Sequence, residues 1–166
     1  MSKVLYDKQA WRKLAVRRDR RHEPLVQKLC SGADGSSGIF TFNKDLMVFA
    51  AMVGYKLQKR TPLSPENIQI VLETYASDQK DAYIYLLGLV TQKEASILKD
   101  ENLTKAIKIF EEYCNSGLDE IKLWLDENPS DPSGVLTLNE KIYEQVKKNR
   151  LNESKEINPE EIELEF

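Results

Sequence analysis

Two apolar stretches decide the fold: residues 44 to 60 read KDLMVFAAMVGYKLQKR, and residues 81 to 90 read DAYIYLLGLV. In both, apolar side chains recur at helical spacing and also cover most of the remaining circumference. A helix that is apolar nearly all round belongs in the interior of a fold. We therefore predict two central helices, one capped by Asn43 and one beginning near Ser77, with Phe49 and Leu86 in the core.

Gly54 lies in the interior of the first of these helices. Glycine there costs up to about 1 kcal/mol relative to alanine, because it orders a very flexible backbone and adds no side chain. A reason for its presence is that another backbone comes close. We predict close packing against Gly54.

The flanking sequence predicts further helices and one extended segment. Helical spacing of apolar residues is found within residues 1 to 21, 22 to 30, 64 to 75, 103 to 117, 118 to 128 and 138 to 149. Gly117 is expected to end one of them with a left-handed cap. Residues 38 to 42, GIFTF, are rich in β-favouring types and predict one short strand or extended segment. The predicted fold class is mainly α, a compact bundle of six or seven helices.

Length and charge suggest how the chain is organised. One domain is expected for 166 residues. Residues 1 to 30 carry nine basic against three acidic side chains, whereas residues 151 to 166 carry one against six. We predict a basic N-terminal arm at 1 to 21, partly ordered, a single helical domain at 22 to 150, and an acidic, disordered tail at 151 to 166.

Several protein classes are excluded by the composition. The longest apolar stretches are about half of the roughly 20 residues that a membrane-spanning helix needs. The N-terminal residues also lack the apolar core of a secretion signal. A cytoplasmic protein is expected, in which Cys30 and Cys114 are buried thiols, because no further cysteine or histidine stands at metal-ligand spacing.

Known catalytic motifs are missing from the sequence. It contains no phosphate-binding glycine loop, GxSxG elbow or HExxH motif. His22 has no nucleophile beside it, and we interpret it as a solvated or capping residue. Asp100, Glu120 and Lys122 have the letters of a nuclease metal site, but a helical period separates Glu120 and Lys122 by about 200°. We predict no enzyme and no catalytic, cofactor-binding or metal-ligating residues.

The basic arm is the best candidate for a binding site. If residues 1 to 21 form a helix, Lys13, Arg17, Arg20 and Arg21 lie along one face, with Arg18 beside or across from it. Such a density of cations suits DNA phosphates. Against this stand the overall pI of about 5.4 and the lack of stacking aromatic residues other than Trp11. The arm could instead neutralise the acidic tail or a partner protein.

A second interpretation concerns residues 39 to 60. A short strand followed by a helix is typical of ribbon-helix-helix regulators, in which paired strands from two chains enter a DNA groove. However, Ile39, Phe40 and Phe42 make this segment apolar, which favours burial. A DNA-binding regulator built on this unit is the alternative function.

Four stretches together resemble one known family: RRHEPL at 20 to 25, GIFTFNKD at 38 to 45, VFAAMVGY at 48 to 55 and IFEEYCNSGL at 109 to 118. They are similar to the Dnd-associated proteins of type 4. These accompany bacterial DNA phosphorothioation systems, which replace a backbone oxygen of DNA with sulfur, often together with restriction. The similarity covers about residues 20 to 129.

This resemblance implies a role beside DNA modification or restriction enzymes, and no reaction. We therefore expect a non-enzymatic accessory protein that binds other proteins of such a system. DNA is a further partner, which the basic arm suggests. The sequence leaves the oligomeric state open.

Overall fold

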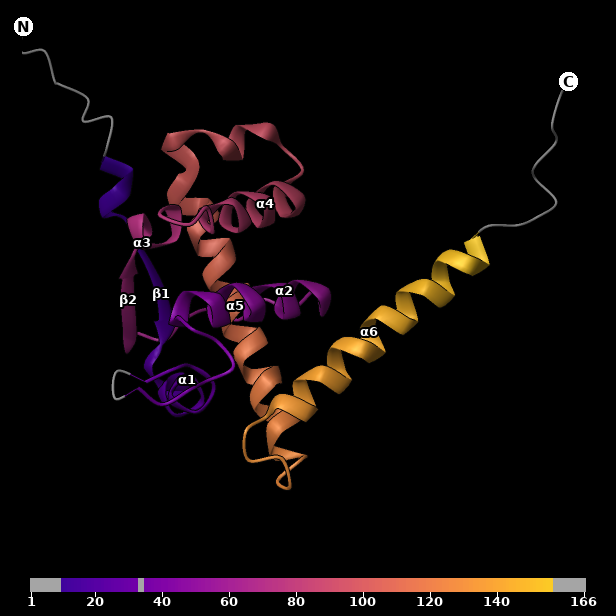
Figure 1. Cartoon of the computed structure of the whole chain (residues 1–166). Coiled ribbons are helices and arrows are strands. Elements are labelled where there is room, and N and C mark those ends of the chain that lie inside the picture. The colour runs from indigo at the N-terminus through magenta and orange to yellow at the C-terminus, as the bar shows by residue number, and fades with distance from the viewer. Residues whose placement is uncertain (1–9, 33–34, 157–166) are drawn as a thin grey trace, which may run out of the picture. The chain divides into compact units, whose positions relative to one another are not determined.

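The computed structural model describes residues 10 to 32 and 35 to 156, without the side chains of residues 153 to 156. Six α-helices, four 3-10 helices and two strands make up this part of the chain (Figure 1). In chain order they are η1 (Ala10–Lys13), β1 (Ala15–Asp19), η2 (Arg20–His22), α1 (Glu23–Leu29), α2 (Asn43–Lys56), β2 (Asn67–Val71), α3 (Leu72–Ala76), α4 (Asp81–Gln92), η3 (Ala95–Leu98), η4 (Asp100–Asn102), α5 (Leu103–Asp126) and α6 (Val135–Glu156). The predicted mainly α class is confirmed.

Contacts divide the chain into two units, residues 1 to 123 and residues 124 to 166. The first unit is built around α5, whose residues 111 to 118 are all buried. Phe110, Cys114 and Leu118 are fully shielded on its inward side. Both predicted apolar helices, α2 and α4, pack against α5 through glycines. The centre of this unit is thus α5 and not either of the two predicted helices. The sequence pattern of α5 is amphipathic and does not by itself indicate a central position.

The crossing of α2 and α5 depends on two glycines. A Cβ added to Gly54 would overlap the carbonyl oxygen of Tyr113, and one added to Gly117 would overlap that of Ala50. The close approach predicted at Gly54 is confirmed. The prediction that Gly117 ends a helix is wrong, since Gly117 lies inside α5. Glycine is needed there because a side chain would push α2 away.

The strands lie where helices were predicted. β1 and β2 pair antiparallel, with Val16 opposite Ile70 and Arg18 opposite Ile68. β1 occupies the segment expected to form a basic helix, and β2 lies within residues 64 to 75, where a helix was also predicted. Ser64 instead donates to Asp19, and a helix forms only from Leu72. The reason is that both segments find their hydrogen-bond partners in each other, which local sequence does not reveal.

Residues 38 to 42 do not form a strand of this sheet. Phe40 makes an isolated bridge to Cys30, so the segment closes back on its own chain after α1. A ribbon-helix-helix element needs a strand that is available for pairing, and the structure supplies none at this place. The structure gives the alternative function built on residues 39 to 60 no support from a strand in this chain, and that function stays a prediction.

The second unit contains the end of α5, a turn and α6. Asp131 holds the turn, because its carboxylate accepts from the backbone N–H of Thr137 at 2.8 Å and from that of Gly134 at 3.1 Å. These bonds lower the pKa of Asp131. They also satisfy N–H groups at the start of α6, which has no preceding turn of helix to bond to. α6 continues to Glu156, beyond the predicted Asn149, and residues 157 to 166 of the predicted tail lie outside the described residues.

Candidate functional site

β1 lies along α5 and is fastened to it at three levels. Glu111, Asn115 and Asp119 follow one another at intervals of four on α5, and they bond to Arg17, Asp19 and Arg21 respectively. Four helical residues advance about 6 Å, and two strand residues advance about 6.6 Å. The two spacings agree for Arg17 and Asp19 in β1, while Arg21, which meets Asp119, belongs to η2.

The first level closes the free edge of the sheet. The backbone N–H of Arg17 points away from β2 and donates to Oε1 of Glu111 at 2.7 Å. Glu111 is buried, and burial raises its pKa to about 7 against the partly opposing effect of this hydrogen bond. The Glu111 carboxyl group thus accepts a backbone hydrogen bond that a third strand would otherwise accept.

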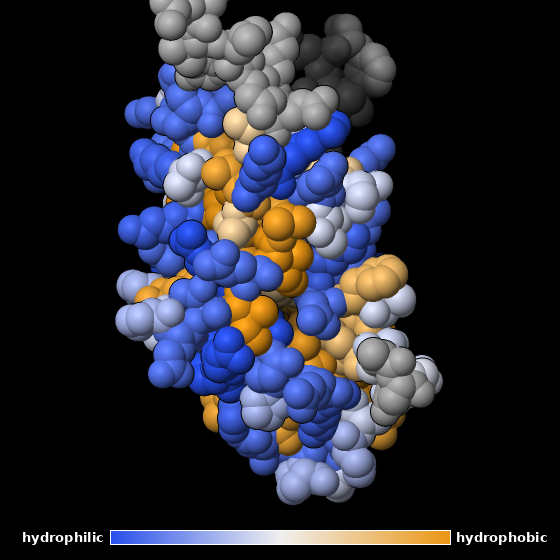
Figure 2. Space-filling view, turned by 90° about the vertical axis from the view of Figure 1, so that its left-hand side faces the viewer, coloured by the Kyte–Doolittle hydropathy of each residue, from blue (hydrophilic) through white to orange (hydrophobic). Residues whose placement is uncertain are grey.

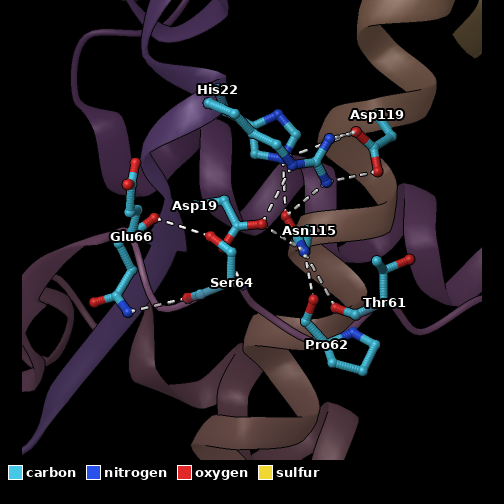
Figure 3. Close-up of polar contacts among 10 residues, drawn as sticks. Asp19, His22, Thr61, Pro62, Ser64, Glu66, Asn115 and Asp119 are labelled. Atoms are coloured by element: carbon cyan, nitrogen blue, oxygen red, sulfur yellow. Dashed lines mark hydrogen bonds and ion pairs between the residues drawn. The ribbon is translucent and has the colours of Figure 1, made fainter.

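Asn115 is the centre of the second level (Figure 3). Its Nδ2 donates to Asp19 at 3.2 Å and to the carbonyl oxygens of Thr61 and Pro62 at 3.3 and 3.1 Å. Its Oδ1 accepts from His22 Nε2 at 2.8 Å. Because Nδ2 must face the two carbonyls, Oδ1 faces the imidazole, and the His22 proton is assigned to Nε2.

Asp19 connects this centre to the segment before β2. Its Oδ1 accepts from the backbone N–H of Ser64 at 2.7 Å and from the Ser64 hydroxyl at 3.1 Å. Burial raises the pKa of Asp19, but the bonds from Ser64, Arg21 and Asn115 together outweigh burial and lower it. Asp19 is therefore a fixed anion that holds β1, α5 and residues 61 to 64 together.

His22 is buried beside this anion and is nonetheless held neutral. Burial lowers its pKa, and the nearby Arg21 adds to this effect, while the bond to Asn115 and the two aspartates oppose it. The predicted solvated or capping histidine is thus an internal hydrogen-bond donor. The ring thus faces the Asn115 amide, with Asp119 Oδ1 3.9 Å from the same Nε2.

The third level uses one of the five predicted DNA-binding residues. Arg21 forms a two-pronged ion pair with Asp119, with 2.9 Å between Nη2 and Oδ2, and its Nε donates to Asp19 at 3.2 Å. These bonds raise the pKa of Arg21. The side chain is 50% exposed, but two carboxylates already occupy its donors.

The other four predicted residues fall into two groups. Arg18 is 2% exposed and points into the core, where its Nη2 pairs with Glu23 at 2.6 Å, while Nε and Nη1 lack an acceptor among the described residues. Lys13, Arg17 and Arg20 are exposed, and none of them forms an ion pair within the described residues. The predicted helical face does not exist, since Arg17 and Arg18 alternate across a strand, and three cations remain at the surface.

The surface around these cations is mixed in character. Figure 2 views the side of the molecule that carries β1 and β2, and a band of hydrophobic residues crosses it between hydrophilic ones. Val71 lies opposite Ala15, on the same face of the two strands as Arg17, and is 51% exposed. Such a surface combines positive charge with apolar area.

The residues with the letters of a nuclease metal site are not arranged as such a site. Asp100 is in η4, and Glu120 and Lys122 are on the helix α5, so the strand geometry of a nuclease site is missing. No group of three metal-binding side chains gathers within the described ranges. Cys30 and Cys114 are buried free thiols, as predicted, and burial raises the pKa of Cys30 to about 11.

Little in the amino-acid sequence points to the residues that matter most at this site. Asn115 and Asp119 lie on opposite sides of the predicted helix end at Gly117, so their common face was not visible. A helix continued through Gly117 places residues 111, 115 and 119 on one stripe. That stripe of three polar residues beside the apolar side of an amphipathic helix is the signal that could have found them.

Comparison with known proteins gives one match. The family model described as DNA sulphur modification system-associated protein 4 matches residues 15 to 162, which is most of the chain and includes β1, α5 and α6. No curated protein and no solved structure matches. None of the chain's helices is long and apolar enough to cross a membrane, as far as the structure describes them.

Proposed function

Because the chain belongs to the family of DNA sulphur modification system-associated protein 4, we propose that it is a non-enzymatic, cytoplasmic accessory protein of a DNA phosphorothioation modification and restriction system. It acts by binding other proteins of that system, DNA, or both. The family membership carries this proposal. The resemblance noted in the sequence points to the same kind of system.

The non-enzymatic part is supported by the polar network on α5. Its ionisable groups are engaged with one another: Asp119 and Asp19 with Arg21, and His22 with the amide of Asn115. A catalytic acid or base needs a free position from which to reach a substrate atom. These side chains instead join β1 to α5 and act as a scaffold.

The DNA part is supported by Lys13, Arg17 and Arg20, which are exposed cations on the consecutive elements η1, β1 and η2. Each lysine or arginine that meets a phosphate releases counterions, so binding weakens as salt rises. Three such contacts give weak, sequence-independent affinity. The apolar band beside them favours a protein as the main partner and DNA as the second.

Substitution of these three residues tests DNA binding. The triple variant Lys13→Ala, Arg17→Ala, Arg20→Ala should bind duplex DNA more weakly, and the slope of log affinity against log salt should flatten by about three contacts. A control triple, Lys93→Ala, Lys99→Ala and Lys105→Ala, removes the same charge from exposed positions elsewhere. Equal loss in both variants would mean that only net charge matters, and no loss in either would remove DNA as a direct partner.

Capture of bound proteins from host lysate, with and without nuclease treatment, tests the protein part. Proteins of the modification system should be retained after nuclease treatment if they bind directly. The non-enzymatic part is tested by incubating the purified protein with DNA and divalent metal. Cleavage that is lost in Glu120→Ala would overturn it.

A further inference from the structure

The outer edge of β2 has no backbone partner among the described residues. β2 pairs with β1 along one edge, and β1 lies between β2 and α5 (Figure 1). Because Arg20 donates to the carbonyl oxygen of Glu66 across this ladder, the even-numbered positions of β2 are the ones bonded to β1. The backbone N–H groups of Asn67, Gln69 and Val71 therefore point away from β1, and none of them donates to an atom of the described part of the chain. Such an edge pairs readily with another strand.

The core-facing side of β2 is covered less completely than that of β1. Val16 and Arg18 of β1 face the core and are 0% and 2% exposed. Their partners in β2, Ile70 and Ile68, face the same way but are only partly buried. Apolar area of β2 thus stays open at the edge of the sheet. A strand added beside β2 would cover this area if it turned apolar side chains toward the core.

The outward side of the sheet is polar and positively charged. Arg17 and Gln69 lie opposite one another in the middle of the two strands, and both are exposed. Lys13 precedes β1 and Arg20 follows it, and both of these cations are exposed as well. An added strand would lie two strand spacings, about 10 Å, from β1. At that separation a long acidic side chain can meet Arg17 above Gln69, so the added strand should be acidic on its outward side.

One segment of the chain has the sequence that fits this edge. Residues 161 to 166 read EIELEF and lie outside the described residues. Acidic and apolar residues alternate in this segment without exception, which is the pattern of a strand with one covered and one solvent-facing side. Ile162, Leu164 and Phe166 share one side of such a strand, and the three glutamates share the other. Both requirements of the β2 edge, an apolar row inward and an acidic row outward, are met by the same six residues.

We propose that residues 161 to 166 add a third strand to the outer edge of β2. The strand runs antiparallel to β2, as β1 does, with Glu163 opposite Gln69. In this register Ile162 and Leu164 lie beside the two partly buried isoleucines of β2, and the glutamates lie on the side that carries the exposed cations. The edge is then covered against pairing with other strands. This inference goes beyond the proposed function, because it involves neither DNA nor another protein.

Hydrogen exchange of backbone N–H groups in the full chain, followed by NMR, tests the added strand. The N–H groups of Asn67, Gln69 and Val71 should exchange about tenfold more slowly, or slower still, than in an unstructured peptide. Ile162→Asp puts a charge into the apolar row and should return these rates by about tenfold toward the peptide value. Ile157→Asp is the matched control, since it makes the same change outside the alternating residues, and it should leave the rates unchanged.

Charge exchange tests the position of Glu163. Arg17→Glu should also speed exchange at the outer N–H groups of β2, and the addition of Glu163→Arg should restore slow exchange. The N–H groups of Ile68 and Ile70, which face β1, should stay slow in every variant and so report that the sheet remains folded. Fast exchange at the outer groups of the wild type, or slow exchange that Ile162→Asp leaves unchanged, would overturn the proposal. No DNA or partner protein enters these measurements, so the proposal can fail while the proposed function stands.

Discussion

The side-chain amide of Asn115 donates to the carboxylate of Asp19 at 3.2 Å, although the two residues are 96 positions apart in the chain. This bond is the middle one of three between α5 and the β1 segment, and both side chains are almost fully buried. Removal of either partner leaves the other without a replacement for its lost bonds, which is where the energetic cost arises.

Asn115→Ala should lower the free energy of unfolding by about 2 to 4 kcal/mol, because it leaves Asp19, His22 and two carbonyl oxygens with unmet hydrogen bonds. Urea denaturation measures this change. Thr104→Ala, at an exposed position of the same helix, should stay within about 0.5 kcal/mol. Equal effects of the two substitutions would show that the network contributes no more than helix propensity.

Glu111 should make the protein less stable as pH rises from about 4.5 to about 7. Its folded-state pKa is raised to about 7 by burial, so in that window the unfolded chain has lost the proton while the folded chain still holds it. Below the window both states are protonated, and above it the loss is complete and constant.

Glu111→Gln removes the charge and keeps an oxygen acceptor for the N–H of Arg17. It should raise the free energy of unfolding at pH 8 by about 1 to 3 kcal/mol and have little effect at pH 4. Urea denaturation at the two pH values checks this. Destabilisation of the variant at pH 8 but not at pH 4 would mean that ionised Glu111 is needed for the contact, and equal destabilisation at both would mean that the amide fits this position less well than the carboxyl group in either form.

His22 acts in the opposite direction. Its pKa is lowered in the folded state mainly by burial, so its contribution to stability is complete above the unfolded value of about 6.5 and is lost as pH falls through the folded value. The chain has a single histidine, so its imidazole signal in a proton NMR titration needs no assignment. The midpoint should lie below 6.5, and Asn115→Ala should lower it further, because the bond to Asn115 favours the charged ring. A midpoint at or above 6.5 would contradict the burial argument.

Gly117→Ala and Gly54→Ala should each destabilise by about 3 kcal/mol or more, because the new methyl group meets a backbone carbonyl that cannot move without separating α2 from α5. Thermal unfolding measures the loss. Gly88→Ala is the control: its methyl group would lie 3.1 Å from the Ala106 Cβ and 3.2 Å from Ile97 Cγ1. There the gain in helix propensity of about 1 kcal/mol offsets part of the crowding, and its effect should be clearly smaller.

Local sequence predicted the elements whose own residues contain the reason for them. α2 and α4 were found from their apolar periodicity, and the close approach at Gly54 from the cost of glycine in a helix. The same reasoning was wrong for Leu86, which is 47% exposed. An apolar run indicates that a helix is buried on at least one side. Which side is buried depends on the helix that packs against it.

The elements that were missed depend on distant residues. β1 contains Arg18 in its core-facing row, and its charge hid the alternation that marks a strand. Arg18 can be buried because Glu23 reaches it from α1. Asp19 likewise can be buried because Asn115 and Ser64 donate hydrogen bonds to its carboxylate. In each case the decisive partner is supplied by the tertiary fold, which no window of the sequence contains.

The agreement between helical and strand spacing along α5 and β1 has a consequence for how this protein can change over evolutionary time. A single inserted residue between Glu111 and Asp119 turns everything after it by about 100°, so that Asp119 would leave Arg21 altogether instead of shifting slightly. An inserted residue in β1 would present the opposite side of the strand. The contact between α5 and residues 17 to 21 thus tolerates the exchange of side chains far better than a change of length. Insertions or deletions should accumulate outside these two segments, in the connecting segments.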